Sequence, residues 1–431
     1  MKILIVAYSG KGHINPSLRF ATRLLKMNVH VTFCTSLSVV QHIDNQTIPH
    51  NLTFAPFSDG HDAGKHPNTP LQQFISDFET HGACAVAQII ASATQPFDCL
   101  VYTTVIPWAA RVAHSHNIKS VLLWCQSASI LVSYYHYFNQ HHSLLSSNNN
   151  NPTFPVNLPG LPPLTMADLP SFLLSSCPKD HKFLVPVLKD HIDVLKISPK
   201  ILVNSVRELE NESVEKLDFL PIGPLIPSDS PCIFEKADDD YYIQWLNTQA
   251  KSSVVYVSFG TIAAFGMEQM EEMASGLVEI GRPFLWVIRE SEQFEKFSKV
   301  EELHKLGMIV RWCYQVEVLS HEAIGCVVMH CGWNSTVEVL VAGVPTVAFP
   351  QWSDQGMNAK MIEDVWKIGV RVRRREGDGV MEGEEMKRCV EMVMEDQEMK
   401  RNGEKWREVM REALKNGGPS TINLQTFLHD V

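Results

Sequence analysis

The stretch that decides the fold runs Ile324-Gly-Cys-Val-Val-Met-His330-Cys-Gly332-Trp333-Asn334-Ser335-Thr336-Val-Glu338. It predicts a buried strand ending at His330, a glycine that allows close backbone approach, and a helix capped by Asn334 or Ser335. The N–H groups and positive dipole end of such a helix suit a phosphate or pyrophosphate. Glu338 lies one turn further on the same helix face, where a carboxylate can accept hydrogen bonds from ribose hydroxyls. A plain capped helix with a core histidine fits the same residues.

This strand-to-helix pattern recurs along the chain, as expected for βαβ units around parallel sheets. Two series of strands are predicted, at 2–7, 29–35, 52–57, 99–104, 120–126 and 200–204, and at 253–260, 283–289, 308–312, 325–330 and 344–349. The series predict an α/β protein with two Rossmann-like domains facing each other across a cleft. Ligands would then lie at the carboxyl ends of the strands.

The domain boundaries follow from composition. We expect an N-terminal, acceptor-binding domain at 1–225, a proline-rich linker at 226–240, and a C-terminal, donor-binding domain at 241–405. A charged helix at 406–431 has no strand to complete and could pack back on the N-terminal domain. The asparagine- and proline-rich residues 139–170 are predicted to form a mobile surface loop.

Composition excludes several classes of protein. A chain of 431 residues with 45% hydrophobic and 20% charged residues is typical of a globular enzyme with two domains. The net charge of −11 argues against nucleic acid or an anionic membrane as main partner. The ten cysteines include no C-x-x-C pair, and no apolar stretch reaches about 18 residues, so we expect a cytoplasmic protein without a membrane segment.

The first predicted strand leads into Ala7-Tyr8-Ser9-Gly10-Lys11-Gly12-His13-Ile14-Asn15-Pro16. Asn15 and Pro16 are predicted to be the N-cap and first residue of a helix, so His13 would lie just outside its N-terminus. The positive helix end disfavours imidazolium and keeps the ring neutral near pH 7. The loop lacks the third glycine of a dinucleotide fingerprint, and no acidic residue ends the second strand, which argues against an NAD(P) enzyme.

Residues Trp312 to Gln355 form a segment of 44 residues with HCGWNS in its middle and Asp-Gln at its end. Here the chain resembles the plant UDP-dependent glycosyltransferases, whose donor-binding box has this length and these three parts. The resemblance extends over the whole chain, including the glycine-rich loop, Ser258-Phe-Gly-Thr261 and Arg282-Pro-Phe-Leu-Trp-Val-Ile288. It is strongest to the subgroup of anthocyanin 5-O-glucosyltransferases and crocetin glucosyltransferases.

The resemblance implies a GT-B fold and a hexosyltransferase of plant secondary metabolism that inverts the anomeric configuration. It implies a role for each matching residue of the donor site. Trp312 would stack on uracil, the Cys313 backbone would pair with the base edge, and Gln315 and Glu338 would hold the ribose; the phosphates would meet Thr261, His330, Asn334 and Ser335 beside Gly332, and the hexose would meet Trp333, Asp354 and Gln355. Trp333 and Gln355 match the pattern associated with glucose donors.

In the implied reaction, His13 is the general base that takes a proton from the acceptor hydroxyl while UDP leaves, and no metal or other cofactor is required. The acceptor would be a flavonoid, another phenol or a carboxylic acid, and the protein a monomer. One departure concerns the aspartate that usually orients this histidine. Its position is occupied by Thr103, a possible uncharged partner of the base, and Asp98 lies about 16 Å away at ~3.3 Å per strand residue.

Two consequences of this departure are open. Base catalysis could be weaker, or the acceptors could be groups that ionise easily, such as carboxylic acids. A second class of function is a small-molecule binding protein that retains the UDP-sugar box but has lost efficient catalysis.

Overall fold

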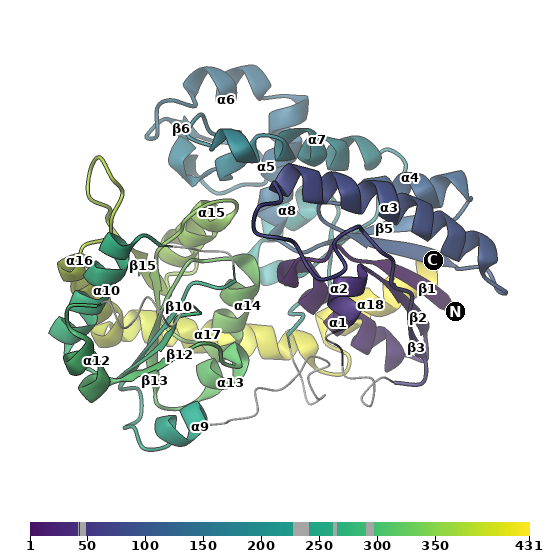
Figure 1. The fold of residues 1–431 in the computed structure, drawn as a ribbon. Helices are drawn as coiled ribbons and strands as arrows, with labels where there is room; N and C mark the ends of the chain where they lie inside the picture. The colour runs from purple at the N-terminus through teal and green to yellow at the C-terminus, as the bar shows by residue number, and fades with distance from the viewer. Residues whose placement is uncertain (42, 44–48, 227–240, 262–264, 290–296) are drawn as a thin grey trace. The chain divides into compact units, whose positions relative to one another are not determined.

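The computed structural model describes residues 1–41, 43, 49–226, 241–261, 265–289 and 297–431. The chain divides into two compact units (Figure 1). Unit 1 contains Met1–Lys236 and Ala413–Val431, and unit 2 contains Ala237–Glu412. The predicted linker lies, except for residue 226, outside the described residues.

Unit 1 is built on a parallel sheet in the order β3-β2-β1-β4-β5-β8-β9. The strands are β1 (Lys2–Val6), β2 (His30–Cys34), β3 (Leu52–Phe54), β4 (Cys99–Thr103), β5 (Lys119–Trp124), β8 (Ile201–Val203) and β9 (Leu220–Pro221). The chain order reverses direction across the sheet between β1 and β4. This is the switch point at which open parallel sheets bind ligands.

Helices cover both faces of this sheet (Figure 1). The α-helices of unit 1 are α1 (Lys11–Leu25), α2 (Leu37–Val40), α3 (Leu71–Ser92), α4 (Trp108–Ser115), α5 (Ala128–Asn139), α6 (His142–Asn148), α7 (Leu184–Val194), α8 (Asn211–Lys216) and α18 (Pro419–Asp430). Because strand side chains alternate, Ile3 and Val101 share one buried cluster with Phe20 of α1 and Phe427 of α18. The C-terminal helix therefore completes the core of unit 1.

Unit 2 repeats the same topology, with the parallel order β12-β11-β10-β13-β14-β15. Its strands are β10 (Val254–Ser258), β11 (Phe284–Val287), β12 (Met308–Val310), β13 (Ile324–Met329), β14 (Thr346–Ala348) and β15 (Gly369–Arg371). Its helices are α9 (Tyr241–Leu246), α10 (Met267–Ile280), α12 (Val300–Leu306), α13 (Gln315–Ser320), α14 (Trp333–Ala342), α15 (Gln355–Lys360), α16 (Gly383–Glu395) and α17 (Gln397–Leu414). The switch point of this sheet lies between β10 and β13.

Three segments differ from the sequence prediction. Residues 139–170 are not one irregular loop, because they include α6 and the antiparallel pair β6 (Pro155–Val156) and β7 (Leu164–Thr165). The edge strands β9 and β15 were not predicted. Their two and three residues carry no alternating pattern long enough to read, and neighbouring strands define them.

Candidate active site

His13 lies at the switch point of unit 1, directly after β1. The prediction that Asn15 and Pro16 start the helix is wrong. α1 begins at Lys11 with Gly10 as N-cap, and the carbonyl of Gly10 accepts the N–H of His13 at 2.8 Å. Pro16 is accommodated inside the helix, where it removes one backbone donor, so it does not mark the first residue. His13 is therefore in the first helical turn, still at the positive end of the dipole.

The surroundings of His13 keep its ring neutral. The Tyr8 ring meets it edge-on, with ring centroids 5.3 Å apart. Its Nδ1 atom is buried and has no hydrogen-bond partner among the described residues. Burial lowers the pKa of His13 to about 4, because the charged ring would lose its hydration. At neutral pH the imidazole can accept a proton.

Thr103 ends β4 on the other side of the same switch point and is fully buried. Its Oγ1 accepts the backbone N–H of Tyr8 at 3.1 Å, so it joins the ends of β1 and β4. The structure forms no hydrogen bond between Thr103 and the Nδ1 atom of His13. Asp98 accepts the N–H of Lys2 at the opposite end of the strands, at 2.7 Å.

In unit 2, β13 leads through His330 into α14 at the switch point. The helix starts at Trp333 with Gly332 as N-cap, so the prediction that Asn334 or Ser335 is the cap is wrong. Both polar residues lie in the first turn of α14 instead. Close packing of the loop requires a glycine at this N-cap, because a Cβ atom on Gly332 would stand 2.6 Å from Nε2 of His330.

A second glycine packs on the same imidazole. A Cβ atom on Gly260 would lie 2.8 Å from the His330 ring, and Gly260 has a φ of +68°. Burial, and then the charge of Arg289, lower the pKa of His330 to about 4. The Arg289 guanidinium donates to the carbonyls of Gly260 and Thr261. These bonds hold the exposed Thr261 at the carboxyl ends of the strands.

The predicted ribose residues form one hydrogen-bonded network. Nε2 of Gln315 donates to Ser335 Oγ at 2.8 Å and to a carboxylate oxygen of Glu338 at 2.6 Å. The Tyr256 hydroxyl donates to Oε1 of Gln315 at 3.2 Å and also contacts the Cys313 sulfur at 3.3 Å. Sequence reasoning missed Tyr256 and Arg289. No motif marks the interior of β10, and no sequence pattern shows that Arg289 reaches the loop at Gly260 and Thr261.

The structure also locates the residues that are predicted to contact the uracil ring and the hexose. Trp312 is 41% exposed and meets the Tyr314 ring edge-on at 4.4 Å between centroids. The side chain of Trp333 is buried beside Trp366. Trp333 therefore contributes its backbone, and not its indole ring, to the start of α14.

Asp354 and Gln355 lie where β14 leads into α15. Asp354 accepts a hydrogen bond from Asn358 at 2.8 Å, and the same amide donates to the Cys331 carbonyl at 2.9 Å. Gln355 accepts the N–H groups of Gln351 and Trp352 at 2.7 and 3.1 Å. These contacts connect the end of the donor box with the His330 loop.

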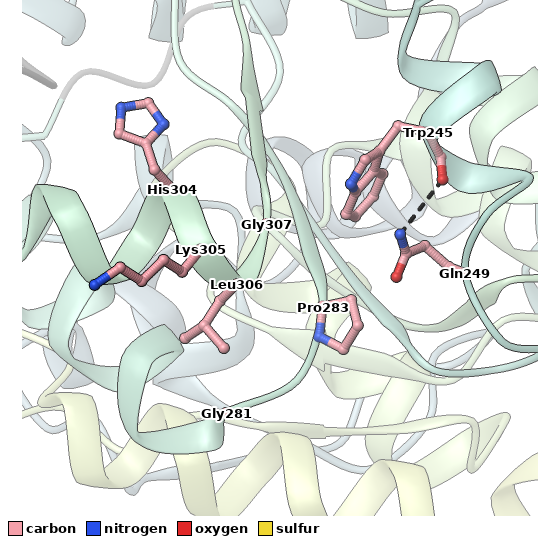
Figure 2. Close-up of a pocket in the computed structure, with 8 residues that line it drawn as sticks. All are labelled: Trp245, Gln249, Gly281, Pro283, His304, Lys305, Leu306 and Gly307. Carbon is pink, nitrogen blue, oxygen red and sulfur yellow. Dashed lines mark hydrogen bonds between the residues drawn. The ribbon is translucent and has the colours of Figure 1, made fainter.

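Figure 2 shows a pocket of unit 2 that is lined by none of these donor-site residues and has a volume of about 310 Å³. Its lining includes Pro283 and Gly307, which immediately precede β11 and β12, together with Trp245 and Lys305. It therefore lies at the amino ends of the strands. His330 lies at the opposite edge, because all strands of this sheet are parallel.

Among the described residues, no group of three or more His, Cys, Asp or Glu residues could hold a metal ion. None of the helices that the structure describes is long and apolar enough to cross a membrane.

Two parallel sheets with the same switch-point topology, one of them with the predicted donor residues joined in a network, are the arrangement expected of a UDP-sugar-dependent glycosyltransferase with a GT-B fold. The chain belongs to the family of UDP-glucoronosyl and UDP-glucosyl transferases, whose model matches residues 227–411. UDP-glycosyltransferase 75C1 of Solanum lycopersicum is 46% identical over 100% of this chain and 98% of its own length. Crocetin glucosyltransferase, chloroplastic, of Gardenia jasminoides is 44% identical over 100% of this chain and 97% of its own. Os79 from O. sativa, solved in complex with UDP, superposes with a TM-score of 0.87 at 28% identity, covering 99% of both chains.

Proposed function

We propose that this chain is an inverting O-glucosyltransferase that transfers glucose from UDP-glucose to a hydroxyl or carboxyl oxygen of a small plant secondary metabolite. His13 is the general base. The observation that carries the proposal is a neutral, largely buried imidazole at the switch point of unit 1, in a protein whose unit 2 has the donor network at its own switch point. Cytoplasmic location and a monomeric state remain predictions from the sequence.

In the proposed reaction, the acceptor oxygen forms a bond to the anomeric carbon as the bond from that carbon to the β-phosphate oxygen breaks. His13 accepts the acceptor's proton through Nε2, because Nδ1 is the buried nitrogen. Negative charge grows on the leaving UDP. The first turn of α14, with Asn334 and Ser335, would stabilise that charge through its N–H groups and dipole, without a metal ion.

The acceptor follows from the strength of the base. A histidine with a pKa of about 4 is a weak base for a phenol, whose own pKa is about 10. A carboxylic acid is already ionised near pH 7 and needs no base. We therefore expect carboxylic acids and acidic phenols to be the best acceptors.

The test is UDP release from UDP-glucose with a panel of carboxylic acids and phenols, for the wild type and His13→Ala. His30→Ala, at an exposed histidine of unit 1, is the control. We expect His13→Ala to reduce transfer to phenols by about 10² to 10⁴-fold and transfer to carboxylates far less. Unchanged transfer to phenols would show that His13 is not the base. If no acceptor stimulates UDP release by the wild type, the binding-protein alternative holds.

A further inference from the structure

The turn that follows Thr103 contains a strained residue. Val105 has a φ of +78°, in the left-handed region that a β-branched side chain rarely adopts. It belongs to the segment Thr103–Ile106, here called the Val105 turn, which connects β4 to α4. A residue persists in such a conformation only where its surroundings hold it there, and this occurs most often at functional sites.

His191 of α7 supplies the contact that holds this turn. Its Nε2 atom accepts the backbone N–H of Val105 at 2.9 Å. The residues are 86 positions apart in the sequence, so the bond connects two distant elements of unit 1. The side chain of His191 is fully buried.

Aromatic neighbours fix the plane of the His191 ring. Tyr102 is parallel to it within 7°, with centroids 6.3 Å apart, and Trp124 meets it edge-on at 5.9 Å. Because Nε2 accepts a hydrogen bond, the proton of the neutral ring must be on Nδ1. Burial lowers the pKa of His191 to about 3, so Nε2 remains an acceptor throughout the neutral range.

The Val105 turn lies beside the proposed base. Thr103, its first residue, accepts the N–H of Tyr8, and the Tyr8 ring contacts the His13 ring. Burial is the largest cause that lowers the pKa of His191, and the charge of His13 is the second. The two imidazoles therefore lie within electrostatic range. The side chain of Val105 is only partly buried. A movement of this turn would therefore change the surroundings of His13.

We propose that His191 is a positioning residue for the transfer reaction: its Nε2 atom holds the Val105 turn in its left-handed conformation, and the turn fixes the surroundings of His13. The inference rests on the proposed role of His13. His191 itself does not contact the reacting atoms. Loss of its acceptor atom would lower kcat, because a shift of about 1 Å in an oriented group can cost about a hundredfold in rate.

Four variants separate positioning from simple stability. His191→Phe keeps an aromatic ring but removes the acceptor, whereas His191→Gln places an amide oxygen near the position of Nε2. Val105→Gly removes the conformational strain, because glycine adopts positive φ freely. The fourth variant combines His191→Phe with Val105→Gly. Leu424→Ala, at a buried core residue of α18, is the control for lost stability alone.

We expect His191→Phe to lower kcat with a phenol about tenfold to a hundredfold and to leave the KM for UDP-glucose unchanged. His191→Gln should keep most of the activity, and Val105→Gly in the His191→Phe background should restore kcat to within about threefold of wild type. If the kcat of His191→Phe equals that of Leu424→Ala, or Val105→Gly gives no rescue, the proposal is wrong.

Two measurements complete the design. Hydrogen exchange on the wild type should show a protected Val105 amide; free exchange there overturns the proposal even if His191→Phe does not fold. His13→Ala is assayed in parallel with the same phenol. Full activity of His13→Ala overturns the role of His13 and this inference with it, whereas an inactive His13→Ala beside a fully active His191→Phe overturns only the inference.

Discussion

Tyr256→Phe tests whether the donor network is set by a residue that does not itself belong to the donor box. The Tyr256 hydroxyl is buried, and burial raises its pKa well above the usual value, so it remains a protonated donor. Its hydrogen bond to Oε1 of Gln315 decides which end of that amide faces Ser335 and Glu338. Phenylalanine keeps the ring and its packing but leaves Oε1 without this donor.

One hydrogen bond of this kind contributes about 1 kcal/mol. If the bond serves to orient Gln315, Tyr256→Phe loses about 1 kcal/mol of affinity for the donor. This loss corresponds to a Kd for UDP that is roughly fivefold weaker. We expect the same fivefold rise in the KM for UDP-glucose, with kcat within about twofold of wild type. Acceptor KM should not change, because the affected network lies wholly in unit 2.

The assay combines titration calorimetry of UDP with initial rates over a range of UDP-glucose concentrations. Tyr241→Phe, at a tyrosine of unit 2 that is 45% exposed, is the control and should leave both values unchanged. A Kd for Tyr256→Phe within a factor of two of wild type would refute the reasoning, since Gln315 would then hold its orientation without Tyr256.

Four further predictions concern the two switch points and the buried groups around them. Gly332→Ala should weaken UDP binding about tenfold in calorimetry, because its Cβ would stand 2.6 Å from His330 and displace the ring; an unchanged Kd would contradict this. The kcat/KM for a phenol should stay constant from pH 8 to about pH 5 and fall near pH 4, where His13 protonates. As the pH is lowered from 6.5 to 5, the unfolding free energy should fall by about 1.4 kcal/mol per pH unit for each buried histidine, because unfolding then takes up protons. Urea titrations measure this slope, and His330→Gln should flatten it. Glu210→Ala should lower that free energy by about 3 kcal/mol, since the buried carboxylate accepts two N–H groups at the start of α5, while Glu212→Ala at an exposed site should change it little.

The sequence was sufficient for the strands that are buried on both faces. Such strands are continuous apolar runs, and predicted segments such as 99–104 and 325–330 correspond to β4 and β13 within a residue or two. The first residues of the helices were harder to predict from the sequence. Asn15-Pro16 and Asn334-Ser335 both have the composition of a cap. Gly10 and Gly332 are nevertheless the N-caps, because only a few residues connect each strand to its helix.

The positioning contacts could not be predicted for a different reason. Gln315 and Glu338 are 23 residues apart, and Val105 and His191 are 86 apart, so only the folded chain brings them together. Tyr256 is one of several large residues in a buried strand, and nothing in the local sequence shows that its hydroxyl reaches Gln315. A motif identifies residues that contact a ligand, whereas the residues that orient them depend on tertiary packing.

The two switch points pose opposite electrostatic problems. In the proposed reaction, negative charge grows on UDP at α14, and a helix N-terminus is suited to it. At α1 the same kind of helix end, together with burial and the absence of a carboxylate at Thr103, disfavours the positive charge that His13 gains with a proton. An acceptor that arrives ionised leaves no proton for His13 to carry and avoids this cost. In the proposed reaction, the residue at position 103 therefore bears on substrate choice as much as on rate, and the advantage of carboxylates over phenols should be larger in this protein than in its Thr103→Asp variant.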